Sequence, residues 1–310
     1  MSVPSLRDRR AAFIYLPLTT AIWGSLYVAA RIALKTIPPI TLVFARYCLS
    51  FPILFAAAKL SGKSIKVRRE DRKYFFLVGI IGYFFSSGLQ IVGTKFAGAS
   101  TASLINSINP IFISFFAVIL LKEKLAVRNI VAMIVALVGV YVVLGGVRQS
   151  GESWGIAFSL ASVVLWGITS SYVRRLTSVY DPLVVTAYVI GTAALLALPA
   201  AAVELLVTPH GPMFSVVNAT SVLYLAIVCT ALAAFLWSKS LSLVEASVCS
   251  LFYPIQPLVS AVLGVLILGE KVGRSFALGA ALIIGGIVFV VISDIRSRRL
   301  GPRKTGGSKT

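Results

Sequence analysis

The sequence predicts an all-α membrane protein with ten transmembrane helices, arranged as two inverted five-helix repeats. Three observations lead to this prediction. Of the 310 residues, 58% are hydrophobic and only 13% are charged; ten apolar segments follow one another; and the second half repeats short motifs of the first. This much apolar surface exceeds what the core of a soluble protein can bury, so the chain is expected to lie in a lipid bilayer.

Each of the ten segments contains about 20 residues, the length that a helix needs to cross a hydrocarbon layer roughly 30 Å thick. Charged or proline-containing stretches separate them. In chain order, the predicted spans cover residues 13–33, 39–60, 74–94, 99–121, 128–146, 153–173, 182–207, 218–239, 246–269 and 275–293.

Short motifs recur in the two halves. Trp23-Gly24 returns as Trp166-Gly167, and Leu121-Lys122-Glu123-Lys124 returns as Leu268-Gly269-Glu270-Lys271. Because a unit with five spans crosses the membrane an odd number of times, its two copies must enter in opposite directions. An inverted repeat of this kind is typical of transporters.

The repeats divide the chain into four regions. The first and second repeats occupy residues 13–146 and 153–293, with a tail at 1–12 before them and a basic tail at 294–310 after them. Both tails are expected on the cytoplasmic side, because of the distribution of Lys and Arg described next.

The formal net charge of +19 does not indicate a nucleic-acid partner, because Lys and Arg are confined to a few loops and the two ends. With a cytoplasmic amino terminus, 22 of the 29 basic residues fall on the inner side. The positive-inside rule therefore predicts a multi-pass protein of the cytoplasmic membrane with both termini in the cytoplasm. The cluster from Lys59 to Lys73, at the loop after the second span, contains seven basic residues, and the equivalent loop after the seventh span contains none.

Residues with catalytic or metal-binding chemistry do not converge in the sequence. The three cysteines, Cys48, Cys229 and Cys249, are scattered without a CxxC or Cys/His pattern, and the single histidine, His210, lies in a loop. The middle third of each span contains neither Asp nor Glu. The sequence therefore predicts no enzyme, no catalytic residue, no cofactor, no metal and no buried carboxylate proton relay.

Polar residues recur at helical spacing inside several spans. Ser103, Asn106 and Asn109 follow one face of the fourth span, and Ser250, Tyr253 and Gln256 are their equivalents in the ninth. A third group lies on one face of the third span: Tyr83, Ser87, Gln90 and Thr94. Because polar groups in hydrocarbon need protein or water beside them, these faces are expected to point inward, to substrate or to ordinary contacts between helices.

Pro110 and Pro257 occupy equivalent positions in the fourth and ninth spans. The missing N–H of each proline leaves the carbonyl four residues earlier, on Asn106 or Tyr253, without its usual donor. Two interpretations stand beside each other. The prolines make kinks satisfied by neighbouring side chains, or they form hinges that also present acceptors to a solute.

Several single residues have two interpretations each. Trp23 and Trp166, at mid-depth in their spans, are plain core or line a cavity. Arg46, the only basic residue well inside a span, snorkels or pairs with carbonyls, or it acts as a gate or an anion ligand. Glu123 and Glu270 are interpreted as solvated helix ends in preference to ion pairs that cap gates.

Small residues occupy matching positions in the last span of each repeat, at Ala132 and Gly139 and at Gly279 and Gly286. Small residues allow close approach of helix backbones in lipid. They predict helix packing within the chain, with a homodimer contact as the alternative, so that monomer and homodimer both stay open.

The duplicated Trp-Gly pairs, the prolines inside the fourth and ninth spans and the Glu-Lys motifs that follow them resemble, in their joint order and spacing, the drug/metabolite transporter superfamily. The chain is most similar to its ten-helix EamA type, over about residues 13–293. The resemblance implies a central cavity surrounded by spans 1–4 and 6–9, with spans 5 and 10 at the periphery. Small four-helix relatives use a glutamate on their first helix, and residues 13–33 contain no acidic residue.

Carried over by position, the resemblance implies that uncharged polar and aromatic side chains line the cavity. The predicted substrate-binding residues are Trp23, Tyr83, Gln90, Asn106, Trp166, Trp237, Ser250, Tyr253 and Gln256, and the predicted hinges are Pro110 and Pro257.

The resemblance implies export of small metabolites by alternating access, with amino acids, aromatic or other neutral zwitterions, as the first class. The expected partners are a small-molecule solute and the lipid bilayer. Two alternatives remain: a proton-coupled drug or cation exporter, and a non-transporting membrane subunit that assists the flipping of a lipid-linked substrate.

Overall fold

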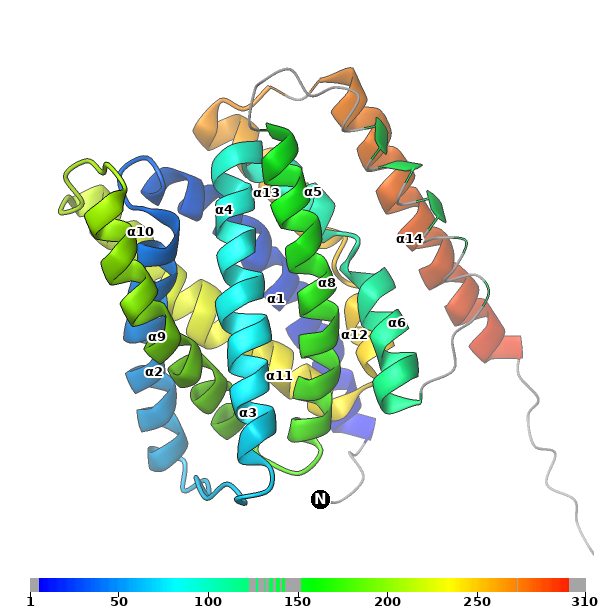
Figure 1. Ribbon diagram of the computed structural model, residues 1–310. Coiled ribbons are helices and arrows are strands. Elements are labelled where there is room, and N and C mark those ends of the chain that lie inside the picture. The colour runs from blue at the N-terminus through cyan, green and yellow to red at the C-terminus, as the bar shows by residue number, and fades with distance from the viewer. Residues whose placement is uncertain are drawn as a thin grey trace, which may run out of the picture.

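The computed structural model of the protein describes residues 6–122, 152–271 and 273–300, together with residues 127, 131, 134–135, 138–139 and 141–142. Within these residues the structure is helical and contains no β-strand (Figure 1). Most of the predicted fifth span, at 128–146, and the outermost parts of both predicted tails lie outside the described residues.

The first half begins with two unbroken helices, α1 (Leu6–Ala33) and α2 (Pro39–Leu60). The third span is continuous, but its middle is a π-helix. The three parts are α3 (Arg72–Val78), η1 (Gly79–Ser86) and α4 (Ser87–Ala97). The fourth span is divided into α5 (Ala99–Asn106) and α6 (Asn109–Leu121).

The second half repeats this pattern. Its two unbroken helices are α8 (Glu152–Thr177) and α9 (Pro182–Val207). The eighth span consists of α10 (Val216–Tyr224), the π-helical η2 (Leu225–Leu232) and α11 (Ala233–Leu243). The ninth consists of α12 (Ala246–Ser250), α13 (Ile255–Leu263) and η3 (Gly264–Leu268), and the last helix is α14 (Arg274–Leu300).

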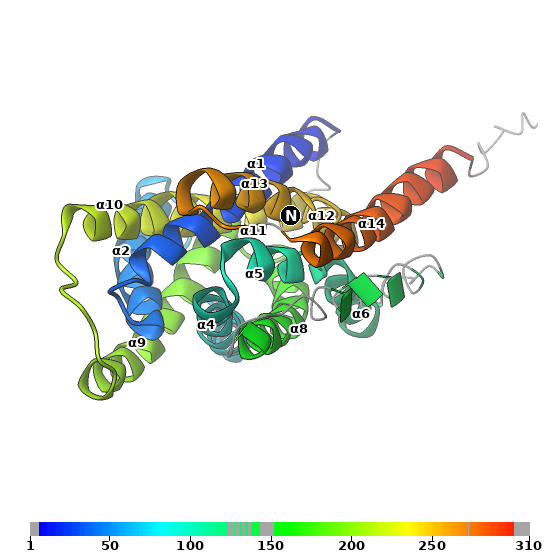
Figure 2. The ribbon, with the colours of Figure 1, turned by 90° about the horizontal axis from the view of Figure 1, so that it is seen from above.

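Eight helical stretches in the described part are long and apolar enough to cross a membrane, and they correspond to the predicted spans one to four and six to nine. The chain is therefore a multi-pass membrane protein. The tenth predicted span falls on α14, whose apolar part, Arg274–Gly286, is shorter. In both views α14 lies at the margin of the bundle (Figures 1 and 2).

The spans connect at two opposite ends of the bundle, which we name the Gly98 end and the Tyr180 end after residues in their loops. The basic loop after α2 lies at the Tyr180 end, where Lys63 Nζ is 3.0 Å from the Asp181 carboxylate. The loop between α9 and α10 lies at the Gly98 end, where Asn218 Nδ2 donates to Thr36 Oγ1 at 2.8 Å. Equivalent loops of the two halves thus lie at opposite ends (Figure 1).

Two of the four small residues, Gly139 and Gly279, form a contact within the chain; Ala132 lies outside the described residues. A Cβ added at Gly139 would lie 3.0 Å from the carbonyl oxygen of Gly279 and 2.7 Å from the side chain of Ile283. A larger residue at position 139 would therefore clash with α14. Close packing of two helices in lipid requires small residues at their interface.

Candidate solute-binding site

Each Trp-Gly pair marks a close crossing between one half of the chain and the other. A Cβ on Gly24 of α1 would lie 2.7 Å from the carbonyl oxygen of Gln256 in α13. A Cβ on Gly167 of α8 would lie 2.8 Å from the backbone of Phe112 in α6. Because glycine allows these backbones to touch, the neighbouring Trp23 and Trp166 are both held at the middle of the bundle.

We predict that Gly167→Val prevents folding of most of the protein, because the contact is with backbone that cannot move aside. Overpacking of a core commonly costs 1–3 kcal/mol, and β-branched side chains have few rotamers in a helix. The measurement is the yield of monodisperse protein after detergent extraction. Gly285→Val is the matched control, since a Cβ at Gly285 of α14 would meet no atom of the described residues within 4 Å, apart from its own helix. Equal yields of the two variants would contradict the assigned crossing.

The π-helical segments η1 and η2 lie at equivalent positions of the two halves. Backbone carbonyls in both segments accept hydrogen bonds from side chains. The carbonyl of Tyr83 in η1 accepts from Tyr47 Oη at 2.8 Å, and the carbonyl of Cys229 in η2 accepts from Trp23 Nε1 at 3.2 Å. In η2, Ala226 O also accepts from Ser50 Oγ at 2.7 Å. The π-helix is rare in proteins, but where it occurs it often lies at a functional site. Here both π-helical segments face the middle of the bundle.

The fourth and ninth spans are interrupted next to the predicted hinge prolines. The chain leaves the helix between Asn106 and Asn109, just before Pro110, and between Ser250 and Ile255, just before Pro257. The carbonyls that these prolines leave free already have donors. Asn106 O accepts from Asn109 Nδ2 at 2.8 Å, and Tyr253 O accepts from the N–H of Gln256 at 2.9 Å. In this structure, therefore, the hydrogen bonds of these two carbonyls are satisfied by neighbouring residues of the same span.

Aromatic rings from both halves form a connected cluster beside these interruptions. The Trp23 ring centroid lies 5.8 Å from that of Trp166, 5.4 Å from that of Trp237 and 6.2 Å from that of Tyr253. Trp166 Nε1 donates to Tyr253 Oη at 2.5 Å, and Tyr83 packs edge-on against Trp166 at 5.5 Å. Because Trp23 and Trp166 already use their N–H groups, they offer ring surface to a ligand.

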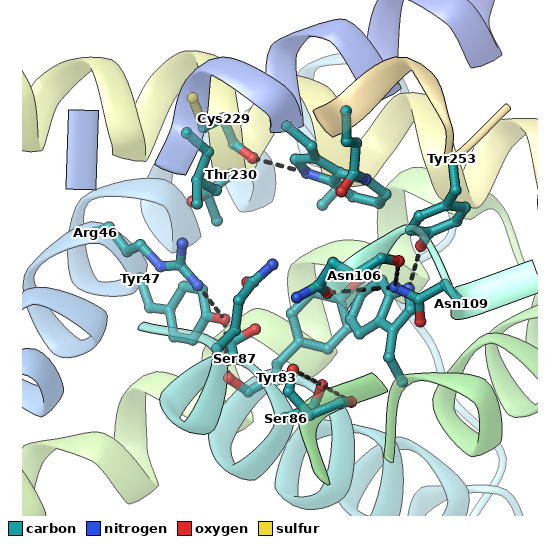
Figure 3. A pocket seen from close by; sticks show the side chains of 17 residues that line it. Arg46, Tyr47, Tyr83, Ser86, Ser87, Asn106, Asn109, Cys229, Thr230 and Tyr253 are labelled. Carbon is teal, nitrogen blue, oxygen red and sulfur yellow. Dashed lines mark hydrogen bonds between the residues drawn. The ribbon is translucent and has the colours of Figure 1, made fainter. Parts of the chain in front are cut away.

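A pocket opens between the aromatic cluster and the polar faces of the third and fourth spans (Figure 3). About 510 Å³ of space free of protein atoms lies among its lining residues, including the part open to solvent. The lining comes from both halves of the chain: Trp23, Leu26, Arg46, Tyr47, Tyr83, Ser86, Ser87, Gln90, Asn106, Asn109, Ser162, Trp166, Cys229, Thr230, Ala234, Tyr253 and Gln256.

Four buried polar atoms of this lining have no hydrogen-bond partner among the described residues: Arg46 Nε, Tyr83 Oη, Asn109 Oδ1 and Gln256 Oε1. Other polar groups of the wall are paired, such as Gln90 Nε2, which donates to Tyr27 Oη at 2.7 Å. Buried polar groups normally have partners, and four of the eight exceptions among the described residues lie in this one pocket wall.

Seven of the nine predicted substrate-binding residues belong to this lining, and two do not. Trp237 is fully buried behind it, with its ring 5.4 Å from both Trp23 and Tyr253. Ser250 is also fully buried, and its Oγ donates to the carbonyl of Ser247 at 2.7 Å. In this structure both residues support the wall without reaching the pocket.

The expectation of an uncharged cavity is wrong, because Arg46 of α2 belongs to the lining. The sequence had left Arg46 open as an anion ligand, while its neighbour Tyr47 went unnoticed. Ser162 of α8 was also missed, although its carbonyl and hydroxyl pair with Ser86 Oγ at 2.8 and 3.2 Å. Arg46 and Tyr47 have Val189 and Ile190 at the equivalent positions of the second half, so comparison of the halves gave no signal for them.

Equivalent arginines cap equivalent helices at the two ends. At the Gly98 end, Arg31 of α1 donates to the carbonyls of Thr94, at 3.4 Å, and Lys95 in the last turn of α4. At the Tyr180 end, Arg174 of α8 donates to the carbonyl of Leu241, at 2.6 Å, in the last turn of α11, and to that of Val244, the residue that follows the helix. A cation at a helix carboxyl terminus satisfies free carbonyls and the helix dipole.

The interpretation of Glu270 as a solvated helix end is wrong. Its carboxylate accepts from the N–H groups of Ala99 at 2.8 Å and Ser100 at 3.0 Å, and from Ser100 Oγ at 2.5 Å. It therefore caps the first turn of α5 from the other half of the chain. Gly98, with φ 83°, makes the sharp corner between α4 and α5 that this cap holds. Glu123, its equivalent, lies outside the described residues.

Comparison with known proteins adds a family to this geometry. The model of the EamA-like transporter family matches residues 10–145 and again residues 153–292. The chain belongs to the EamA-like transporter family. It is thus a membrane transporter, and the resemblance noted in the sequence is confirmed.

Two curated relatives of this EamA protein span most of its length. An uncharacterised transporter of Archaeoglobus fulgidus is 28% identical over 281 residues, covering 90% of this chain and 98% of the relative. A Chlamydia trachomatis protein named as an S-adenosylmethionine/S-adenosylhomocysteine transporter is 27% identical over 285 residues, covering 86% of each. A solved crystal structure that is 22% identical has the same fold, with a TM-score of 0.71 over 94% of this chain and 99% of that one.

Proposed function

We propose that this EamA protein exports small neutral or zwitterionic metabolites, with amino acids as the leading class, by alternating access. The observation that carries the proposal is a pocket bounded by both halves, with amides and hydroxyls on one side and aromatic rings on the other. Such walls suit a solute with a hydrogen-bonding head and an apolar body. Placement between two halves is where alternating-access carriers bind their solutes.

The proposed motion is a rocking of the two halves about the interrupted helices next to Pro110 and Pro257. We further propose that ten spans form the inverted repeat, with both termini and the Tyr180 end in the cytoplasm and the Gly98 end outside. The seven basic residues from Lys59 to Lys73, in and on either side of the loop after α2, support this orientation.

Single-cysteine labelling tests this orientation. In a chain without its three natural cysteines, Ser64→Cys reports on the Tyr180 end and His210→Cys on the Gly98 end. We expect an impermeant maleimide to label His210→Cys in intact cells and Ser64→Cys only after permeabilisation, since both positions are exposed. Labelling of both from the same side would exclude an inverted repeat.

The function itself is tested by counterflow in proteoliposomes that contain the purified chain alone. Liposomes preloaded with a panel of amino acids, nucleosides and quaternary amines receive a trace of each labelled solute. Accumulation of amino acids alone supports the proposal. Absence of flux for the whole panel would favour the subunit that assists lipid-linked substrate flipping.

A proton-coupled exporter of cations or drugs is the alternative within transport. Among the described residues, no Asp or Glu lines the pocket, so the site offers no carboxylate to a cation or a proton. The Chlamydia relative suggests a second solute, since S-adenosylhomocysteine combines an amino-acid head with an aromatic base. It belongs in the same counterflow panel.

A further inference from the structure

Arg46 is a buried cation whose surroundings contain no counter-ion among the described residues. Its exposed fraction is 3%, and neither of the two ion pairs in the described part of the chain involves it. The guanidinium carbon lies 4.8 Å from the centroid of the Tyr47 ring. A buried charge is costly unless it is paired, so this position calls for an anionic partner.

The structural arginines of the same molecule look different. Arg31 and Arg174 each donate to two backbone carbonyls at a helix end. Arg46, in contrast, makes one side-chain hydrogen bond, from Nη2 to Tyr47 Oη at 3.1 Å, and its Nε has no partner. A guanidinium has five N–H donors in a fork that matches a carboxylate, and most of that capacity is unused here.

The free group points where a solute would lie. Figure 3 shows the Arg46 side chain extending from α2 toward the middle of the lining residues. In the same wall, Asn109 Oδ1 and Gln256 Oε1 are buried acceptors without donors, at equivalent positions of the two repeats. The pocket therefore contains an unsatisfied anion-binding group together with unsatisfied acceptors for an N–H donor.

We propose that Arg46 binds the carboxylate of the transported solute, so that the solutes are organic carboxylates. This inference rests on the proposed function: it keeps amino acids as the leading class and adds simple monocarboxylates, which are anions, to the expected solutes. The amide oxygens of Asn109 and Gln256 accept from an amine when the solute has one, and Trp23 and Trp166 cover its apolar body. Amino acids and simple monocarboxylates share the required group, whereas amines of the same shape lack it.

Matched trios of solutes test the proposal on the wild-type chain. One trio is L-phenylalanine, 3-phenylpropanoate and 2-phenylethylamine; the other is L-leucine, 4-methylpentanoate and 3-methylbutylamine. We expect both carboxylates of each trio to raise the Tm of the purified protein and to compete in counterflow, and the amine to do neither. Amines that stabilise or compete as well as the carboxylates would overturn the proposal.

Variants at position 46 add a second test. Arg46→Met should weaken carboxylate binding about 10- to 100-fold, as expected for a lost charge-assisted pair, and Arg46→Lys should restore part of it. Lys59→Met is the control, because it removes an exposed charge from the end of the same helix. Unchanged carboxylate affinity in a folded Arg46→Met protein would overturn the proposal.

The two proposals fail in distinguishable ways. Stabilisation by carboxylates without counterflow would contradict transport and support the role of Arg46. Counterflow without preference for carboxylates would support transport and contradict the role of Arg46.

Discussion

Replacing Tyr253 with alanine will abolish counterflow while the variant still inserts and folds. Tyr253 lies between α12 and α13 and joins three tryptophans, with its ring 5.4 Å from Trp237 and 6.2 Å from Trp23 and its hydroxyl 2.5 Å from Trp166 Nε1. Loss of two ring pairs and one hydrogen bond should lower the initial rate about 100-fold. The rate is measured in proteoliposomes at matched protein content.

Two further variants make this result specific. Tyr253→Phe keeps the ring and loses only the hydroxyl, so we expect a fall of about fivefold. Phe115→Ala removes an aromatic ring that is 42% exposed on α6, and it should leave the rate within about twofold. Trp166→Ala should match Tyr253→Ala. Wild-type flux in folded Tyr253→Ala and folded Trp166→Ala would mean that the pocket is not the solute site.

Replacing Glu270 with alanine will destabilise the Gly98 end and slow transport. The change removes three hydrogen bonds to α5 and leaves the N–H groups of Ala99 and Ser100 at a partly buried helix end without their acceptor. A lost cap combined with lost charge-assisted bonds corresponds to about 2–3 kcal/mol. The expected readout is a lower Tm of the purified protein together with a lower counterflow rate.

Glu70→Ala is the matched control for Glu270→Ala. Glu70 lies 3.9 Å from Arg68 in an exposed pair, with its side chain 74% exposed, and such pairs contribute little. Glu270→Gln should give an intermediate Tm, because the amide keeps one acceptor but loses the negative charge that favours a helix amino terminus. If Glu270→Ala and Glu70→Ala shift the Tm equally, the cap is not a stabilising contact.

The apolar spans and much of the pocket wall could be predicted from the sequence. The seventh predicted span, 182–207, has the same bounds as α9, because Asp181 and Pro182 give an unambiguous start. Gln256 was predicted to bind substrate and Asn109 was placed on an inward polar face, because both repeats have an amide directly before a proline. Repetition at equal spacing converts two weak patterns into one usable signal.

Other features depend on tertiary context that the sequence pattern does not contain. The middles of the third and eighth spans are π-helical. Their residues are mostly apolar, and such a composition fits an α-helix as well as a π-helix. Glu270 looked solvated because its partners, Ala99 and Ser100, are about 170 residues away in the chain. Arg46 has Val189 at the equivalent position, so the repeat gave no indication of its role.

The close crossing of Gly24 with α13 affects how the protein is made. Gly24 and Trp23 are inserted early, whereas Gln256, which Gly24 touches, is synthesised more than two hundred residues later. At the usual pace of translation this delay is roughly 10–50 s. For that time the first helix must sit in the bilayer with its glycine face against lipid or a helper protein. The interior of the transporter is therefore completed only when the last quarter of the chain arrives.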